Sequence, residues 1–231
     1  MHIQLTDILI CPVCGPEYGL IVRADRIVER RVREGALGCP HCRRQYEIHE
    51  GVAWLARGRP EAGDEKRRAS DWEPDTTVQP QGEQPQRGGA VSDREEAVRT
   101  AALLGLGRDT TRASGFVALV GHAAARAVAV AALLDGQEFV AVGAHAAGLH
   151  DSERVSRIAT DDSLPFYDAK LRAIWLGGDA TDVLLEEATR ALHPMGRLVL
   201  EPAPADAHER LAARGLRVLA HERETLVATR A

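Results

Sequence analysis

Residues 116–142 read FVALVGHAAARAVAVAALLDGQEFVAV, and this segment is the strongest indication of the fold class. Its first five residues, 116–120, are an apolar run typical of a buried parallel strand. Residues 123–134 are rich in Ala and Leu, which are strong helix formers. Residues 139–142 are a second apolar run. A strand, a turn at Gly121, a helix and another strand make one βαβ unit.

The same alternation continues toward the C-terminus. We expect a strand at 172–176, a helix at 181–192, a strand at 197–200, a helix at 207–214 and strands at 217–220 and 224–228. Upstream, Ser92 followed by Glu95 is a capping-box pattern, which predicts the start of a helix. Strands that alternate with helices are typical of a doubly wound α/β sheet. Residues 92–231 are therefore predicted to form one α/β domain.

Composition divides the remainder of the chain into two parts. Residues 58–91 are rich in Pro, Gly, Gln, Glu and Arg and poor in aliphatic residues, so we expect a flexible linker there. Residues 1–57 carry all four cysteines and end in an apolar patch at Val52, Trp54 and Leu55. The sequence thus predicts a small N-terminal domain, a linker and a larger α/β domain.

The four cysteines form two Cys-x-x-Cys pairs, made of Cys11, Cys14, Cys39 and Cys42. Two such turns can place four thiolates around one ion, and thiolates favour Zn²⁺. The N-terminus does not resemble a secretory signal, so we expect a cytoplasmic protein in which paired cysteines bind metal rather than form disulfides. Cysteines without metal and a redox pair are the alternatives. The sequence predicts a structural zinc site.

Three segments of the N-terminal domain carry a family resemblance: LTDILICPVC at 5–14, GCPHC at 38–42 and YEIHEGVAWL at 46–55. Together they resemble the Trm112-like zinc-ribbon family. Glu47 and Ala53 stand where that family usually has Pro, and Glu50 stands where it usually has Asp. The resemblance implies a small domain that binds and stabilises class I methyltransferases acting on tRNA, rRNA or translation factors. The zinc-ribbon front end of bacterial 23S rRNA guanine methyltransferases is a related alternative.

Two later segments resemble class I S-adenosylmethionine-dependent methyltransferases: DSLPFYD at 162–168 and LLEEATRALHPMGRLVLEP at 184–202. The resemblance implies a Rossmann-like sheet. In that family the first strand ends in an acid and a glycine-rich turn, and the second strand ends in an acid. Here Leu119 replaces the first acid, Ala123 and Ala125 replace the later glycines, and Gly143 follows the second strand. We therefore assign no catalytic and no cofactor-binding residue, and the sequence argues against bound S-adenosylmethionine.

Two functions follow from these resemblances. The first is a zinc-binding pseudoenzyme, in which the degenerate methyltransferase-like domain acts as a scaffold or an activator subunit. The alternative is an active S-adenosylmethionine-dependent methyltransferase on RNA or a translation-related protein. A protein partner is expected in the first case, either a methyltransferase-type fold or a larger assembly. We expect the apolar edge at Val52, Trp54 and Leu55 to lie against a methyltransferase-type fold, in this chain or another.

Charge bears on the remaining partner classes. The net charge is 29 − 34 = −5, and only 4% of the residues are aromatic. RNA is a candidate partner because five arginines lie between the two Cys-x-x-Cys pairs: Arg23, Arg26, Arg30, Arg31 and Arg33. Acidic residues are interleaved with them, and residues 1–57 net only 8 − 7 = +1. Specific DNA binding is therefore not expected. A membrane span at 115–134 is not expected either, because Arg126 lies near its middle.

Overall fold

The computed structural model describes residues 1–56, 89–107, 115–161 and 163–230, so the predicted linker lies almost wholly outside the described part. The N-terminal part consists of short elements, where η marks a 3-10 helix: η1 (Ile3–Ile8), β1 (Ile10–Cys11), β2 (Gly15–Gly19), β3 (Ile21–Val28), β4 (Arg31–Gly38), β5 (Gln45–His49) and β6 (Val52–Trp54). This part is hereafter called the ribbon.

The C-terminal part alternates strands and helices. Its elements are α1 (Gly89–Leu103), β7 (Phe116–Gly121), η3 (His122–Arg126), α2 (Ala127–Ala131), β8 (Glu138–Val142), η4 (Ala144–Ala146), β9 (Val155–Ala159), β10 (Leu171–Gly177), α3 (Asp182–Ala191), β11 (Leu192–Glu201), α4 (Ala207–Ala212), β12 (Leu216–Glu222) and β13 (Thr225–Arg230). None of the helices in the described ranges is both long and apolar enough to cross a membrane.

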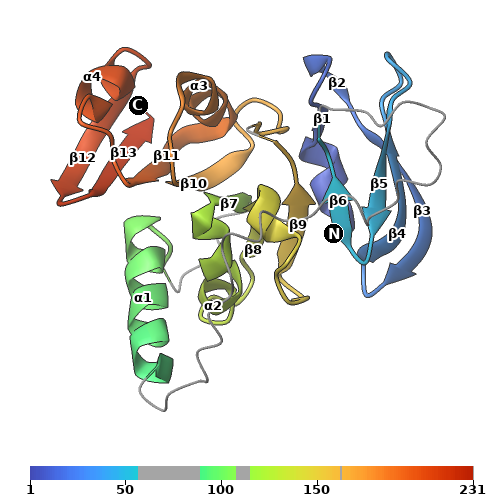
Figure 1. Ribbon diagram of the computed structural model, residues 1–231, viewed down its shortest axis with the longest axis horizontal. Coiled ribbons are helices and arrows are strands. Elements are labelled where there is room, and N and C mark those ends of the chain that lie inside the picture. The colour runs from blue at the N-terminus through green and yellow to red at the C-terminus, as the bar shows by residue number, and fades with distance from the viewer. Residues whose placement is uncertain (57–88, 108–114, 162, 231) are drawn as a thin grey trace, which may run out of the picture.

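Eleven strands form one continuous sheet in the order β12-β13-β11-β10-β7-β8-β9-β6-β5-β4-β3 (Figure 1). Strands β9, β8, β7, β10 and β11 are parallel, and β13 is antiparallel to β11. The chain proceeds outward from β7 to β9 and then returns to the other side of β7 with β10. This reversal between β7 and β10 is that of a doubly wound sheet of the methyltransferase type, so the predicted fold class is confirmed. Strands β7 to β13 are hereafter called the Rossmann-like sheet.

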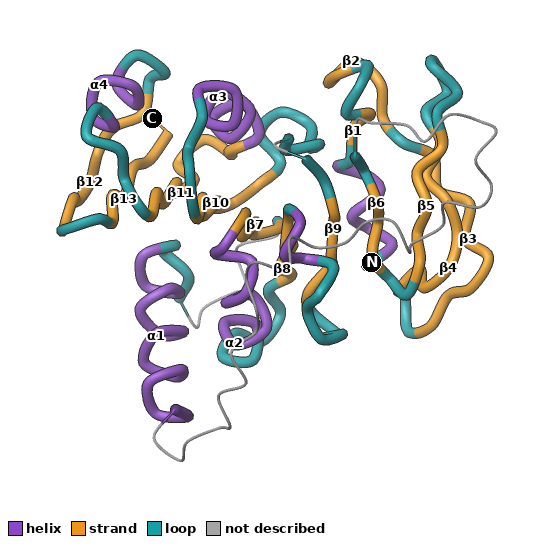
Figure 2. The backbone as a smooth tube through the Cα atoms, in the orientation of Figure 1, coloured by secondary structure: helices purple, strands orange, loops and turns teal. Residues whose placement is uncertain are grey.

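Helices cover both faces of the Rossmann-like sheet, with α1 and α2 on one side and α3 and α4 on the other (Figures 1 and 2). Side chains alternate accordingly along β7. Val117 and Leu119 join the apolar cluster under α1 and α2, whereas Ala118 and Val120 join the cluster under α3 and α4. Because neighbouring residues of a strand point to opposite faces, the near-continuous apolar run of β7 fills two cores.

Strand β9 was not predicted, because Ser156 and Arg157 interrupt its apolar pattern. Both residues are nevertheless buried. The Ser156 hydroxyl accepts a hydrogen bond from the His2 backbone N–H at 2.9 Å. Arg157 donates to the carbonyl of Leu149 at 2.7 Å and to that of Glu50. Two of these three partners belong to the ribbon, so sequence periodicity within β9 could not reveal the strand.

Two helix predictions need correction. The helix expected at 123–134 is divided into η3 and the short helix α2, which ends at Ala131. Helix α1 begins at Gly89, so Ser92 lies within the helix and not at its N-cap. By contrast, the helix expected at 181–192 forms as α3. Thr181 is its N-cap, and the Thr181 hydroxyl accepts a hydrogen bond from the Leu184 N–H at 3.2 Å.

The ribbon joins the Rossmann-like sheet through strand pairing. Strand β6 runs parallel to β9, with Ala53 opposite Ile158, and the Leu55 N–H donates to the Ala159 carbonyl at 2.7 Å. Ala53 and Leu55 are fully buried. Of the apolar edge predicted at Val52, Trp54 and Leu55, Val52 and Leu55 are buried where β6 meets the Rossmann-like sheet of this same chain, whereas the Trp54 side chain is 37% exposed.

Polar groups reinforce the boundary between the ribbon and the Rossmann-like sheet, hereafter the seam. The buried Arg31 of β4 donates to the carbonyls of Glu153 at 2.8 Å and Val155 at 3.1 Å. Arg33 forms an ion pair with Asp151, which lowers the pKa of that carboxyl group. Two of the five arginines considered for RNA binding are thus turned toward the seam.

Candidate functional site

The four cysteine sulfurs lie close together at one end of the ribbon. Each Sγ is within 4.8 Å of the others, and the Cys11–Cys42 and Cys14–Cys39 distances are both 3.8 Å. An ion bonded to four sulfurs at about 2.3 Å in a tetrahedron separates the sulfurs by about 3.8 Å. All four cysteines are free thiols. The cluster therefore has the dimensions of a tetrahedral metal site and could hold a metal ion.

Two tight turns bring the cysteine pairs together. Cys11 ends β1, and Gly15 after the first pair has a φ of +82°. Cys39 follows β4, and its N–H donates to the carbonyl of Arg44 at 2.9 Å. The N–H of Arg43, which has a φ of +60°, donates to the Cys39 carbonyl at 3.0 Å. A residue in the left-handed region thus follows each Cys-x-x-Cys turn directly, where the chain turns back.

The thiols have unequal environments. Burial opposes ionisation of Cys11, yet hydrogen bonds from the Tyr46 hydroxyl and from the Cys14 backbone N–H lower its pKa to about 7. Burial and the other three thiols raise the pKa of Cys14 to about 12. Four thiolates at this spacing repel one another, and a divalent cation between them would offset that repulsion. The donor set therefore fits a soft divalent cation.

The second candidate site is the carboxyl edge of the parallel strands at the β7–β10 reversal, where open α/β sheets bind ligands. Leu119 is fully buried and lies opposite Trp175 of β10. A Cβ added to Gly121 would lie 2.2 Å from the Gly177 carbonyl oxygen, and one added to Gly177 would lie 2.4 Å from the Ala123 nitrogen. The space beside these two glycines is thus taken by backbone atoms of the chain itself. A Cβ added to Gly143 or Gly178, by contrast, would meet no atom closer than 3.5 Å.

The neighbouring strand also ends without a carboxylate. Strand β8 is followed by Gly143, with a φ of +110°, and then by η4. His145 of η4 and His122 of η3 are exposed, with ring centroids 4.8 Å apart at 75°. An imidazole cannot accept two hydroxyl hydrogen bonds as a carboxylate does. These residues therefore do not fit the ribose recognition that the family resemblance implies.

Beside this edge lies an ion-pair network that the sequence analysis missed. Arg126 pairs with Glu96 of α1 at 2.7 Å and with Glu201 of β11 at 2.5 Å, and its guanidinium carbon lies 5.0 Å from the Trp175 ring centroid. Burial raises the pKa of Glu201, but hydrogen bonds from Arg126 and Thr225 lower it overall. Glu201 belongs to a segment quoted above for its family resemblance, yet its partners lie far away in sequence. The network ties α1, η3 and β11 together.

Two exposed arginines of the ribbon, Arg23 and Arg26, are paired with acids. Arg23 lies 3.5 Å from Asp25, and Arg26 lies 3.3 Å from Glu34. Such exposed pairs stabilise little but neutralise the local charge. The structure therefore does not turn this arginine run into a uniformly basic surface.

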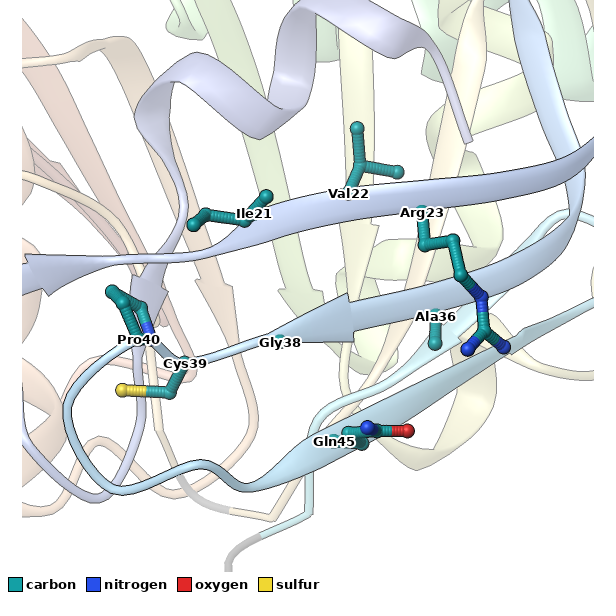
Figure 3. Close-up of a pocket in the computed structure, with 8 residues that line it drawn as sticks. All are labelled: Ile21, Val22, Arg23, Ala36, Gly38, Cys39, Pro40 and Gln45. Carbon is teal, nitrogen blue, oxygen red and sulfur yellow. The ribbon is translucent and has the colours of Figure 1, made fainter.

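A hollow of about 300 Å³ lies on the ribbon, and Figure 3 shows the side chains around it. Its lining residues come from β3, from β4 and the turn after it, and from β5: Ile21, Val22, Arg23, Ala36, Gly38, Cys39, Pro40 and Gln45. None of them belongs to the Rossmann-like sheet. The hollow is therefore separate from the carboxyl edge discussed above.

Several solved structures are similar to part of this chain at low sequence identity. No protein-family model and no curated protein matches the chain. A chain of the complex between the Haloferax volcanii Trm112 methyltransferase activator and a methyltransferase is 16% identical, with a TM-score of 0.42 over 62% of this chain and 93% of that chain. A methyltransferase of Bacillus halodurans C-125 is 19% identical, with a TM-score of 0.40 over 56% and 71%. An S-adenosylmethionine-dependent methyltransferase of Methanococcus maripaludis is 12% identical, with a TM-score of 0.44 over 61% and 85%. The fold class of this chain rests on its own strand order and not on these similarities.

Proposed function

We propose that Cys11, Cys14, Cys39 and Cys42 bind one structural Zn²⁺ in a Trm112-like ribbon. The support is that the four sulfurs lie within 4.8 Å of one another, with two of the distances at 3.8 Å, and that a tight turn holds each pair. The ribbon is small, and a metal supplies folding free energy that a core of this size cannot supply alone.

The ribbon binds and stabilises the Rossmann-like sheet of its own chain. Strand β6 occupies the edge of β9, and Arg31 and Arg33 find their partners across the seam. In the Haloferax volcanii complex an activator and a methyltransferase are separate proteins. In this chain the ribbon and the Rossmann-like sheet belong to one polypeptide and pair through β6 and β9, so the ribbon stabilises the sheet in cis. A protein partner would then bind another surface of the molecule.

The Rossmann-like domain acts through binding and not through methyl transfer, as a pseudoenzyme scaffold or activator subunit in the cytoplasm. One observation carries this proposal. At the β7–β10 reversal, the room that Gly121 and Gly177 provide is taken by backbone atoms of this chain. The buried Leu119 and the absence of an acid directly after β8 point the same way.

The alternative is an active S-adenosylmethionine-dependent methyltransferase on RNA or a translation-related protein. The strand order favours it, as do three positive-φ glycines at the carboxyl edge, Gly121, Gly143 and Gly178. An enzyme of this kind would have to hold the cofactor without the usual carboxylates.

Calorimetric titration of the purified, zinc-loaded chain with S-adenosylmethionine tests the two functions. We expect no heat of binding from the wild-type chain. A matched variant with Leu119→Asp and Gly143→Asp restores two family acids and shows whether the edge can be opened. Micromolar binding to the wild-type chain would refute the pseudoenzyme proposal and support the enzyme. Metal analysis of the same sample tests the zinc site separately.

A further inference from the structure

The proposed metal centre has a buried side and an exposed side. Cys11 and Cys39 are buried, whereas Cys14 and Cys42 are half-buried. Water, protons and thiol reagents reach a metal-bound thiolate through its exposed side. The fate of the metal should therefore depend on what covers the sulfurs of Cys14 and Cys42.

His41 covers Cys14. Its Nδ1 lies 3.5 Å from the Cys14 Sγ, so a residue of the second Cys-x-x-Cys turn contacts a sulfur of the first. A metal-bound thiolate can only accept a hydrogen bond, so the imidazole donates its Nδ1–H to that sulfur. The contact links the two turns on the exposed side of the centre.

Tyr18 holds the His41 ring in place. The two rings are stacked, with centroids 4.1 Å apart and planes at 21°. Tyr18 is a β2 residue, and it packs with Cys14 against the same apolar cluster. An exposed imidazole would otherwise rotate among several conformers. The stack keeps Nδ1 directed at the sulfur and keeps one face of the ring from solvent.

The buried side has its own donor. The Tyr46 hydroxyl lies 3.4 Å from the Cys11 Sγ, and both residues are buried. Tyr46 and His41 thus contact the cysteine cluster from outside it, Tyr46 inside the core and His41 at the surface. Only the surface contact depends on a side chain that solvent can reach.

We propose that His41, held by Tyr18, is a positioning residue that protects the Cys14 thiolate and slows loss of the metal. The proposal rests on the zinc site proposed above. A hydrogen bond to a thiolate withdraws charge from the sulfur and makes it less reactive toward protons and electrophiles. Loss of an outer hydrogen bond of this kind typically costs about 10–100-fold in metal affinity. We expect zinc release to accelerate by about tenfold when the hydrogen bond from His41 to the Cys14 sulfur is removed.

The test measures zinc release from the full chain with a chromogenic chelator after addition of N-ethylmaleimide. Peptide mass spectrometry identifies the first cysteine that is alkylated. His41→Ala removes the donor and the stack, and Tyr18→Leu removes the stack alone. Both should release zinc faster, with Cys14 alkylated first. The Co²⁺-loaded His41→Ala variant should also show a shifted sulfur-to-metal absorption band.

Two controls separate this effect from general destabilisation. Tyr18→Phe keeps the stack, and His49→Ala removes an exposed imidazole that pairs with Glu34 and does not contact sulfur. Both should release zinc at the wild-type rate. Unchanged release from Tyr18→Leu and His41→Ala would overturn the proposal while leaving the zinc site intact. A wild-type chain purified without metal would overturn both.

Discussion

Leu55→Ala should destabilise the ribbon and the Rossmann-like sheet together. Leu55 is fully buried at the seam, and its N–H donates to the Ala159 carbonyl. The substitution removes about three methylene equivalents at about 0.8 kcal/mol each, or roughly 2.4 kcal/mol. The cavity left behind brings the usual range to about 2–5 kcal/mol. With a urea m-value of about 2 kcal/mol per molar, a loss of about 3 kcal/mol lowers the midpoint by about 1.5 M.

Two probes report on the two parts during urea unfolding. In a background in which Trp54 and Trp72 are replaced by Phe, fluorescence of the buried Trp175 follows the Rossmann-like sheet, and chelator-detected zinc follows the ribbon. Both should shift by the same amount in Leu55→Ala. Leu219→Ala is the matched control, because Leu219 of β12 is 45% exposed and its loss should cost under about 0.5 kcal/mol. Two separate unfolding transitions, only one of which shifts in Leu55→Ala, would refute the inference that the seam couples the two parts.

Three further predictions concern metal, ligand and pH. Metal analysis should find one Zn²⁺ per chain, and less than half an equivalent in the wild type would count against the site. Cys39→Ser should abolish zinc binding and unfold the ribbon. Millimolar S-adenosylmethionine should leave the melting temperature of the wild type unchanged, whereas ligand at 100 times its Kd would stabilise a real site by about 2.7 kcal/mol. Because Arg33 lowers the pKa of Asp151, that carboxylate stabilises the fold above its unfolded pKa of about 4, and the contribution is lost as pH falls through the lower folded pKa. Asp151→Asn should flatten this part of the acid-unfolding curve, and an unchanged curve would contradict the role of the pair.

Local patterns were enough for much of the fold. The apolar runs that became β7, β8, β10 and β11 are continuous because both faces of a parallel sheet are buried. Thr181 caps α3 through a contact only three residues away in sequence. The spacing within each Cys-x-x-Cys pair confines its two sulfurs to one turn. In each case the residues that cause the local structure lie within a few positions of one another in the sequence.

Contacts between distant residues decided the rest. Strand β9 forms although Arg157 and Ser156 interrupt its pattern, because carbonyl and N–H groups up to 154 residues away satisfy them. Arg126 reaches Glu201 across 75 residues, and neither residue alone signals the pair.

The amino-acid sequence alone was enough to predict the fold class, the four members of the cysteine cluster, and the presence of Leu119 and Gly143 where the family that the chain resembles has acids. These follow from residue type and short-range periodicity. The three-dimensional fold was needed to show that β6 pairs with β9 of the same chain, and that backbone atoms fill the space beside Gly121. Strand pairing and close packing depend on which segments meet in space. That outcome is set by the burial and hydrogen bonding of the whole chain at once, and no single segment encodes it.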